Sequence, residues 1–319
     1  MAARSQPAPK RLIALDFDGV LVDSVGESSL SALEAARRLW GDRVIPPDAE
    51  LERAGRRARL LKDMAVVRPC VETGYENIVQ IRLLLEGMPA DELLRDWRAR
   101  VLPEAMARWS LDRKALVALF GRVRDEWIAR DLRGWLAPNA TYGPEVAGAV
   151  RACLARGDEV FVVTTKQAQF TAALLEGLAG LPELAATAAD DDDNEKGGGG
   201  GGPGGATIQP RPPGEGGYAR IISTTLSGRP KVDVLEELRA AHAGEGTRCV
   251  FVEDKLSTLE TTAARFAQQR GGGQAKIPWE LVLVDWGYNT EEERARARGL
   301  GIEVVDRSGF ARALEGGGA

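Results

Sequence analysis

The sequence has 319 residues, of which 44% are hydrophobic and 28% are charged, as in globular proteins and unlike disordered ones. Its length suits one large domain or two ordinary domains. The formal net charge is −5, from 42 basic and 47 acidic residues, which argues against a basic surface for nucleic acid. The single histidine, His242, excludes metal sites that need two histidines, so we expect any catalysis to rest on carboxylates, lysine or threonine.

The cysteines and the hydropathy pattern bear on the compartment. Cys70, Cys153 and Cys249 lie too far apart for a metal or redox motif, and we expect buried or idle thiols in a reducing compartment. No hydrophobic run approaches the roughly 18 to 20 residues that a membrane helix needs. The segment before the first hydrophobic strand is too short for a signal peptide. We therefore expect a soluble cytoplasmic protein, and the Ala-, Ser- and Arg-containing start leaves the plastid as the alternative.

Short hydrophobic runs, several of them rich in β-branched residues, recur along the chain. They lie at 12–15, 160–163, 221–222, 250–252, 281–284 and 302–305. Most are continuous rather than alternating, which is typical of parallel strands buried on both faces. Helical periodicity occupies 168–178 and 232–241, between strands. This alternation predicts an α/β fold with a doubly wound, mainly parallel sheet.

The segment 25–135 differs from its surroundings, because helical spacing dominates it and strand signals are weak. Its hydrophobic residues recur at intervals of three and four, as at Leu116 and Phe120. We therefore predict an all-helical insertion at 25–135 in an α/β core that is formed by 1–24 and 136–319.

A second insertion is predicted inside that core, at 186–217. It contains a run of aspartates at 190–193 and a run of glycines at 197–202, followed by proline-rich sequence. Such a segment buries too little hydrophobic surface to offset the entropy lost on ordering, so we expect it to be disordered.

The most informative stretch follows the first strand and reads Asp16-Phe17-Asp18-Gly19. Open α/β sheets bind ligands at the carboxyl ends of their strands, and residues two apart on an extended chain point the same way. Both carboxylates would therefore face one crevice. Because crowded carboxylates at an apolar strand end are costly to ionise, we expect a divalent cation or a cationic side chain beside them. For the pair alone, a helix cap and turn would be the alternative.

Three further strand ends carry polar residues. Thr164 and Thr165 follow the next core strand, where hydroxyl and backbone N–H groups could bind phosphate oxygens or cap a helix. Lys231 opens a predicted helix, against the helix dipole, which suggests an anionic ligand or a carboxylate partner, with a plain surface lysine as the alternative. Glu253 and Asp254 form another acidic pair after a strand.

With these four motifs in this order, the sequence resembles the haloacid-dehalogenase-like (HAD) hydrolases. Residues 16–24 match the first motif nearly letter for letter, and Trp286-Gly287-Tyr288-Asn289 is similar to the phosphoglycolate-phosphatase-like branch. The stretch 68–76 resembles an uncharacterised plant, algal and cyanobacterial subgroup. The resemblance implies a Rossmann-like core and makes the helical insertion a substrate cap.

The resemblance also implies a Mg²⁺-dependent phosphatase acting on a small phosphorylated metabolite, without a nucleic-acid or membrane partner. Asp16 would attack phosphorus to form an aspartyl-phosphate, while Asp18 would protonate the leaving oxygen and then activate water. The ligands of Mg²⁺ would be the Asp16 carboxylate, the Asp18 main-chain carbonyl and Asp254. Thr164 and Lys231 would neutralise the phosphoryl oxygens. An acid at position 18 favours phosphatases and phosphomutases over dehalogenases, which lack it.

One position departs from the family pattern. Thr258 stands where a second acid usually follows the metal-binding Asp254, so either Glu253 substitutes as a metal partner or metal binding and activity are weakened or lost. This leaves two alternatives to the phosphatase, namely a non-catalytic binding or regulatory protein on the HAD fold and a phosphomutase. In the helical insertion, Arg68 and Glu72 are the candidates for substrate contact. The substrate and the oligomeric state stay open.

Overall fold

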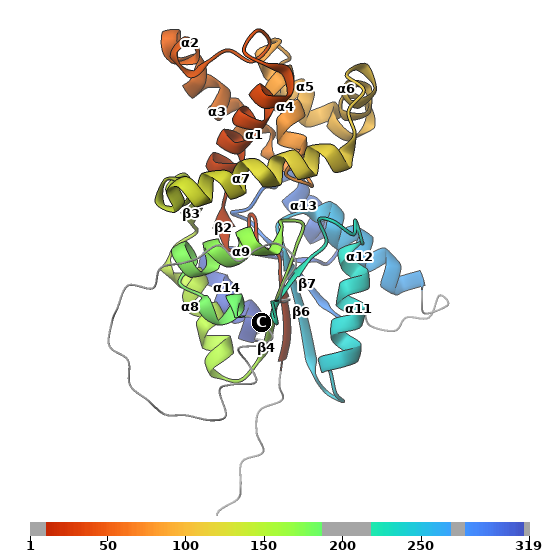
Figure 1. Cartoon of the computed structure of the whole chain (residues 1–319). Helices are drawn as coiled ribbons and strands as arrows, with labels where there is room; N and C mark the ends of the chain where they lie inside the picture. The colour runs from red at the N-terminus through yellow and green to blue at the C-terminus, as the bar shows by residue number, and fades with distance from the viewer. Residues whose placement is uncertain (1–10, 187–217, 269–277, 316–319) are drawn as a thin grey trace, which may run out of the picture.

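The computed structural model of the chain describes residues 11–186, 218–268 and 278–315 (Figure 1). Within them, six parallel strands form one sheet in the order β5-β4-β1-β6-β7-β8. The strands are β1 (Arg11–Leu15), β4 (Glu159–Thr164), β5 (Ile221–Ser223), β6 (Arg248–Glu253), β7 (Glu280–Val284) and β8 (Glu303–Val305). Each predicted hydrophobic run is one of these strands, so the predicted doubly wound α/β fold is confirmed.

Helices cover both faces of the sheet, because successive residues of each strand point to opposite sides. One face carries α8 (Pro144–Ala155), α9 (Ala168–Leu174), α10 (Pro182–Ala185) and α14 (Arg307–Glu315). The other face carries α11 (Lys231–His242), α12 (Leu256–Gln268) and α13 (Glu291–Gly299). In β1, Ile13 and Leu15 pack into the first layer and Leu12 and Ala14 into the second. This double burial explains why the strands read as continuous hydrophobic runs.

A second group of helices follows the short strand β2 (Val22–Asp23) and ends before β3 (Ala140–Thr141), which pairs with β2 in antiparallel fashion. We call this group, residues 25–136, the helical insert. Its α-helices are α1 (Val25–Trp40), α2 (Asp48–Glu52), α3 (Arg56–Val67), α4 (Glu76–Leu85), α5 (Ala90–Asp96), α6 (Leu102–Arg108) and α7 (Arg113–Leu136).

The helical insert has a hydrophobic cluster of its own, which includes Leu33, Ile78, Trp97 and Phe120. In Figure 1 its helices gather at one end of the molecule, with α7 running across between them and the sheet. The helical character predicted for 25–135 is therefore observed, while its status as a separate domain stays a prediction.

Two predictions concern segments at the limits of the structure. The low-complexity insertion predicted at 186–217 lies, apart from Ala186, outside the described residues. The helix predicted over 168–178 begins as expected, but α9 ends at Leu174 and continues as a π-helical turn, Leu175–Ala179. In the part of the chain that the structure describes, no helix combines the length and hydrophobicity needed to cross a membrane.

Candidate active site

Carboxylates from two neighbouring strands meet at the carboxyl end of the sheet. Asp16 follows β1, and Glu253 and Asp254 lie at the end of β6, which pairs with β1. One oxygen of each of the three side chains lies within 4.8 Å of the other two, and all three side chains are buried. Together with Asp18 and Lys231 they line a cavity of about 330 Å³. The structure therefore brings together residues that are more than 200 positions apart in the sequence.

Lys231 supplies the cation that the crowded carboxylates require. It is the first residue of α11, and its Nζ lies 2.7 Å from Asp16 Oδ1 and 2.7 Å from Glu253 Oε2. Burial acts to lower the pKa of Lys231, but the two carboxylates outweigh it and raise that pKa above its ordinary value. The carboxylate partner expected for this helix-opening lysine is thus present.

The positive charge of Lys231 does not fully compensate the negative charges of the three buried carboxylates. Burial, with the charge of Glu253, raises the pKa of Asp16 to about 7 despite the Lys231 ammonium. Burial and the charge of Asp16 also raise the pKa of Asp254. Carboxylate oxygens this close together in a buried pocket are the donor set that hard divalent cations such as Mg²⁺ prefer, so these residues fit the predicted metal.

Glu253 is already engaged through both of its carboxylate oxygens. Oε2 accepts the hydrogen bond from Lys231 Nζ, and Oε1 accepts from the backbone N–H groups of Asp254 at 3.1 Å and Lys255 at 3.2 Å. These bonds make Glu253 the anchor of Lys231. Asp16 and Asp254 are therefore better placed than Glu253 to bind a cation.

The backbone around Asp254 approaches it so closely that two neighbours must be glycine. A Cβ on Gly19, whose φ is +90°, would lie 2.1 Å from Asp254 Oδ2, and one on Gly287 would lie 2.4 Å from Asp254 Cβ. The N–H of Tyr288 donates to Asp254 Oδ2 at 2.7 Å, and the Asn289 amide donates to the Asp254 carbonyl at 2.8 Å. The Trp-Gly-Tyr-Asn stretch after β7 thus fixes the orientation of Asp254, a role that sequence reasoning did not assign.

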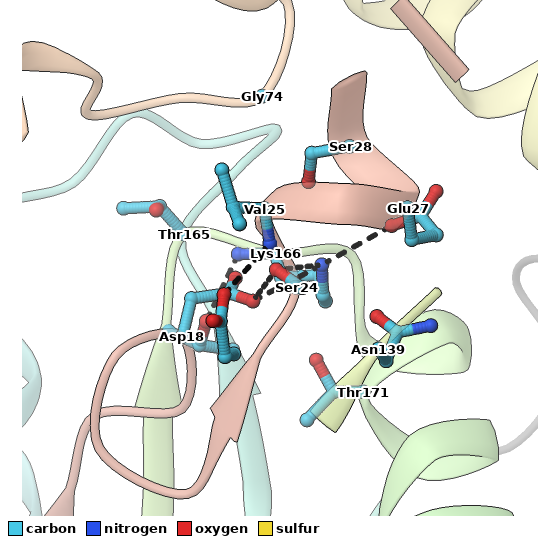
Figure 2. Close-up of polar contacts among 12 residues, drawn as sticks. Asp18, Ser24, Val25, Glu27, Ser28, Gly74, Asn139, Thr165, Lys166 and Thr171 are labelled. Carbon is cyan, nitrogen blue, oxygen red and sulfur yellow. Dashed lines mark hydrogen bonds and ion pairs between the residues drawn. The ribbon is translucent and has the colours of Figure 1, made fainter. Parts of the chain in front are cut away.

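Asp18 has a different partner, which the sequence analysis missed. Its Oδ1 lies 3.2 Å from Nζ of Lys166 and accepts a hydrogen bond from the Ser24 hydroxyl (Figure 2). Burial acts to raise the pKa of Asp18, but the charges of Lys166 and Arg68 outweigh it and hold that pKa below its ordinary value. In the sequence, Lys166 directly follows Thr164 and Thr165 in the stretch that resembles the second motif, but no role was assigned to it.

The two threonines play unequal parts. The side chain of Thr164 is buried away from the cavity, and its Oγ1 accepts a hydrogen bond from the backbone N–H of Lys166 at 3.0 Å. Thr165 lines the cavity, and its hydroxyl donates to the carbonyl of Glu72 at 2.7 Å. Thr164 therefore makes a local turn hydrogen bond but does not cap α9, whose N-cap residue is Gln167. Of the two threonines, Thr165 is the one that lines the cavity.

Four residues of the stretch 68–73 in the helical insert line the cavity, namely Arg68, Val71, Glu72 and Thr73, and we call this stretch the roof of the cavity. Arg68 is 8% exposed, its guanidinium lies 4.0 Å from the centre of the Tyr288 ring, and its Nε has no hydrogen-bond partner among the described residues. Glu72 also lines the cavity, but its carboxylate pairs with Arg98 at 2.9 Å. Of the two residues predicted to contact substrate, Arg68 has a buried donor without a partner among the described residues, whereas the Glu72 side chain is 48% exposed and paired with Arg98.

Thr258 lies in the wall of the same cavity. The position where HAD proteins usually carry a second acid thus contributes a hydroxyl to the site. Lys255, the residue after Asp254, does not face it as a free cation, because its Nζ donates to the carbonyls of Pro69, at 2.8 Å, and Val71.

A scan of the chain against models of protein families finds no match, and a search of curated proteins finds none either. Solved structures do match. The chain is similar to a candidate phosphoglycolate phosphatase from Lactobacillus delbrueckii subsp. bulgaricus, with 13% identity, 96% of this chain and 99% of the other covered, and a TM-score of 0.55. It is similar to a predicted phosphatase from Clostridium acetobutylicum, with 12% identity, coverage of 97% and 99%, and a TM-score of 0.52.

A predicted phosphoglycolate phosphatase from Haemophilus somnus matches with 16% identity, coverage of 96% and 97%, and a TM-score of 0.51. At these identities the likeness concerns the fold. The narrower resemblance of residues 68–76 to a plant, algal and cyanobacterial subgroup stays a prediction. The chain therefore has a haloacid-dehalogenase-like fold of the kind found in phosphoglycolate-phosphatase-like proteins, as its motifs implied.

Proposed function

We propose that this chain is a Mg²⁺-dependent phosphatase that hydrolyses a small phosphorylated metabolite through an aspartyl-phosphate on Asp16. The observation that carries the proposal is the convergence of Asp16, Lys231 and Asp254 beside Asp18 in one cavity at the carboxyl end of the sheet. The cavity volume of about 330 Å³ suits a small substrate. The fold shared with proteins named as phosphatases supports the same conclusion.

Asp16 is the nucleophile in this proposal. Lys231 holds its Oδ1 at 2.7 Å, which restricts rotation of the carboxylate and leaves Oδ2 to attack phosphorus. The new bond joins an Asp16 oxygen to phosphorus as the bond from phosphorus to the ester oxygen breaks. Lys231 also compensates negative charge on the phosphoryl oxygens, and Thr165 stands at the same wall.

Asp18 moves the protons. It donates one to the departing ester oxygen, and its carboxylate then takes one from the water that attacks the aspartyl-phosphate. This second attack releases inorganic phosphate and restores Asp16. Mg²⁺, held by the carboxylates of Asp16 and Asp254 and by the main-chain carbonyl of Asp18, would supply positive charge for the phosphoryl group.

The helical insert is the cap in this proposal, and Arg68 is its contact with substrate. The buried guanidinium lines the cavity together with Asp16 and Asp18, and its free Nε is a donor for an anionic oxygen. Stacking on Tyr288 fixes the plane of the guanidinium.

The test is release of inorganic phosphate from p-nitrophenyl phosphate, followed by a panel of phosphorylated metabolites, with and without Mg²⁺. We expect multiple turnovers that require Mg²⁺ and that Asp16→Asn abolishes. Asp42→Asn, which changes an exposed aspartate in the loop after α1, is the matched control and should keep full activity. Full activity of Asp16→Asn would remove the proposed nucleophile.

The presence of Thr258 in the cavity wall, where an acid is usual, favours one second candidate. A non-catalytic binding or regulatory protein would bind phosphorylated ligands in the same cavity without turning them over. Ligand-induced thermal stabilisation with no phosphate release across the panel would support it. A phosphomutase would use the same residues and would return an isomer of the substrate in place of inorganic phosphate.

A further inference from the structure

We propose that Lys166 is a positioning residue that holds Asp18 in place for proton transfer, and that the helical insert keeps Lys166 aligned through Glu27. The proposal rests on the role given to Asp18 in the proposed function. Lys166 ends the stretch 163–166 that resembles the second motif, but the proposed function gives it no role. Lys166 lies among Asp18, Ser24 and Glu27, as Figure 2 shows.

Lys166 is a buried cation whose ammonium group is surrounded by oxygen atoms. Its side chain is 3% exposed, and Nζ lies 3.2 Å from Asp18 Oδ1, 3.4 Å from Ser24 Oγ and 3.9 Å from Glu27 Oε2. Burying an ammonium group is costly unless it is paired. The two carboxylates on either side of Nζ provide that pairing and fix its position between them.

The contacts on Asp18 are unequal between its two oxygens. Oδ1 takes both the Ser24 hydroxyl and the Lys166 ammonium, whereas no hydrogen bond reaches Oδ2 from any residue that the structure describes. Asp18 lines the main cavity and the smaller one beside it under α4 and α7. Fixing Oδ1 from one side therefore leaves Oδ2 as the oxygen that can exchange a proton in the cavity.

The far side of Lys166 is set by the helical insert. Glu27 of α1 is fully buried, and its two oxygens accept from Arg124 of α7 at 2.7 Å each. Glu27 Oε1 also accepts from the Ser31 hydroxyl at 2.6 Å. A continuous line of charged side chains thus runs from Asp18 in the core through Lys166 and Glu27 to Arg124 in the insert. The insert is thereby connected to the proton-transfer residue through these side-chain contacts.

The decisive variant is Lys166→Met, which keeps the unbranched stem and removes the charge. Glu27 retains Arg124 in this variant, so no carboxylate in the insert is left unpaired. The reference variant is Asp18→Asn. The matched control is Lys62→Met, which makes the same change at an exposed position in α3.

The readout is kcat/KM for p-nitrophenyl phosphate and for benzyl phosphate, two esters of similar size. This ratio reports only the steps up to departure of the leaving group. Nitrophenolate departs without a proton, whereas the benzyl alkoxide needs one, so only benzyl phosphate depends on the acid. We expect Lys166→Met to lower kcat/KM for benzyl phosphate about tenfold or more and for p-nitrophenyl phosphate less than about threefold. Lys62→Met should change neither.

A double variant distinguishes a loss of Asp18 positioning from a general disruption of the site. If Lys166 acts through Asp18, Lys166→Met should cost nothing further in the Asp18→Asn background, because the two residues then work as one unit. Equal losses on both esters, no loss on benzyl phosphate, or an undiminished extra loss in the double variant would each overturn the proposal.

The proposed function and this proposal fail in different ways. If the unmodified chain hydrolyses neither ester, the crystal structure of Lys166→Met decides the positioning claim. If it also hydrolyses no compound of the metabolite panel, the phosphatase proposal fails. A carboxylate of Asp18 that rotates away from its present contacts would support positioning. An unchanged Asp18 rotamer would overturn it.

Discussion

The lysines near the site form ion pairs with three of its carboxylates, and the carboxylate without such a pair is the one most available to a metal ion. Lys231 pairs with Asp16 and Glu253, while Lys166 pairs with Asp18. Asp254 takes part in no ion pair among the described residues, and burial raises its pKa. It is therefore the carboxylate whose charge most requires an added cation.

Asp254→Asn tests this assignment directly. The change removes one anionic ligand while keeping the size of the side chain, so the affinity for Mg²⁺ should fall by about 10- to 100-fold or more. We expect Mg²⁺ to raise the Tm of the unmodified chain and to raise that of the variant only at much higher concentration. Equal stabilisation of both proteins by Mg²⁺ would exclude Asp254 as a ligand.

Gly19 provides a test with an internal control. Gly19 and Gly55 both have positive φ, of +90° and +65°, but only Gly19 has a neighbour that a methyl group would strike. Alanine at either position should cost about 1–2 kcal/mol through backbone strain. Only Gly19→Ala should also displace Asp254 and lose activity, measured as phosphate release at saturating Mg²⁺. Gly55→Ala losing as much activity would contradict the close-approach argument.

At the scale of elements, α1 and α7 are joined by one buried and one exposed ion pair. Glu27 and Arg124 are buried, whereas Arg38 and Glu126 lie at the surface, where their side chains are 35% and 55% exposed. Exposed pairs contribute little because water screens them, while breaking a buried pair leaves a charge without a partner. The two pairs connect the same helices and so form a matched comparison.

We expect Glu27→Gln to lower the free energy of unfolding at pH 7 by about 3 kcal/mol, and Glu126→Gln by less than about 1 kcal/mol. Burial acts to raise the pKa of Glu27, but Arg124 and Lys166 outweigh it and hold that pKa below its ordinary value of 4.5. A lowered pKa stabilises the fold above pH 4.5, and the contribution is lost as the pH falls through the folded-state pKa.

Denaturant titrations of both variants from pH 7 down to acid conditions measure this effect. The stability difference between the unmodified chain and Glu27→Gln should shrink as the pH falls below 4.5. A difference that stays constant with pH would show that the glutamate acts through packing and not through its charge.

The strands and helices of the core could be predicted, because their hydrophobic runs and helical spacing extend over enough residues to be recognised in the sequence. The ribbon of β2 and β3 was not, since each strand has two residues and the partners Val22 and Thr141 are distant in sequence. The π-helical turn after α9 was also missed, because its hydrophobic spacing is that of a helix.

In the candidate active site, too, residues in local motifs could be predicted, whereas contacts between residues far apart in the sequence could not. Asp16 and Asp18 could be identified from a motif at a strand end, and Lys231 from its place at a helix start. The contacts of Lys166 with Ser24 and of Arg124 with Glu27 join residues 142 and 97 positions apart, and no pattern in the sequence marks them. Glu253 was expected as a metal partner, yet its bonds to Lys231 and the backbone became visible only in the fold.

For the molecule as a whole, the helical insert is fastened to the core directly above the cavity. Lys255 Nζ donates to the carbonyls of Pro69 and Val71, and the Thr165 hydroxyl donates to the carbonyl of Glu72. Thr165 lies one residue beyond the end of β4, and Lys255 lies two residues beyond the end of β6. The roof of the cavity is thus held by side chains that neighbour the catalytic candidates.

Lys255→Met should increase the mobility of residues 68–73. We expect faster hydrogen–deuterium exchange of backbone amides at 68–73, with exchange in the strands unchanged, because the variant removes two contacts to that loop only. Lys114→Met, at an exposed position of α7, is the matched control and should leave exchange unaltered throughout. Unchanged exchange at 68–73 in Lys255→Met would show that other contacts hold the roof.

The most direct measurement is to trap the phosphorylated chain and locate the modification. Asp18→Asn, quenched in acid during turnover of p-nitrophenyl phosphate with Mg²⁺, should carry one phosphoryl group on the peptide that contains Asp16, since loss of the proton acceptor slows its hydrolysis. Introducing Asp16→Asn should abolish both the modification and phosphate release. Turnover that proceeds with Asp16 unmodified at every time point, or that survives Asp16→Asn, would contradict an aspartyl-phosphate mechanism.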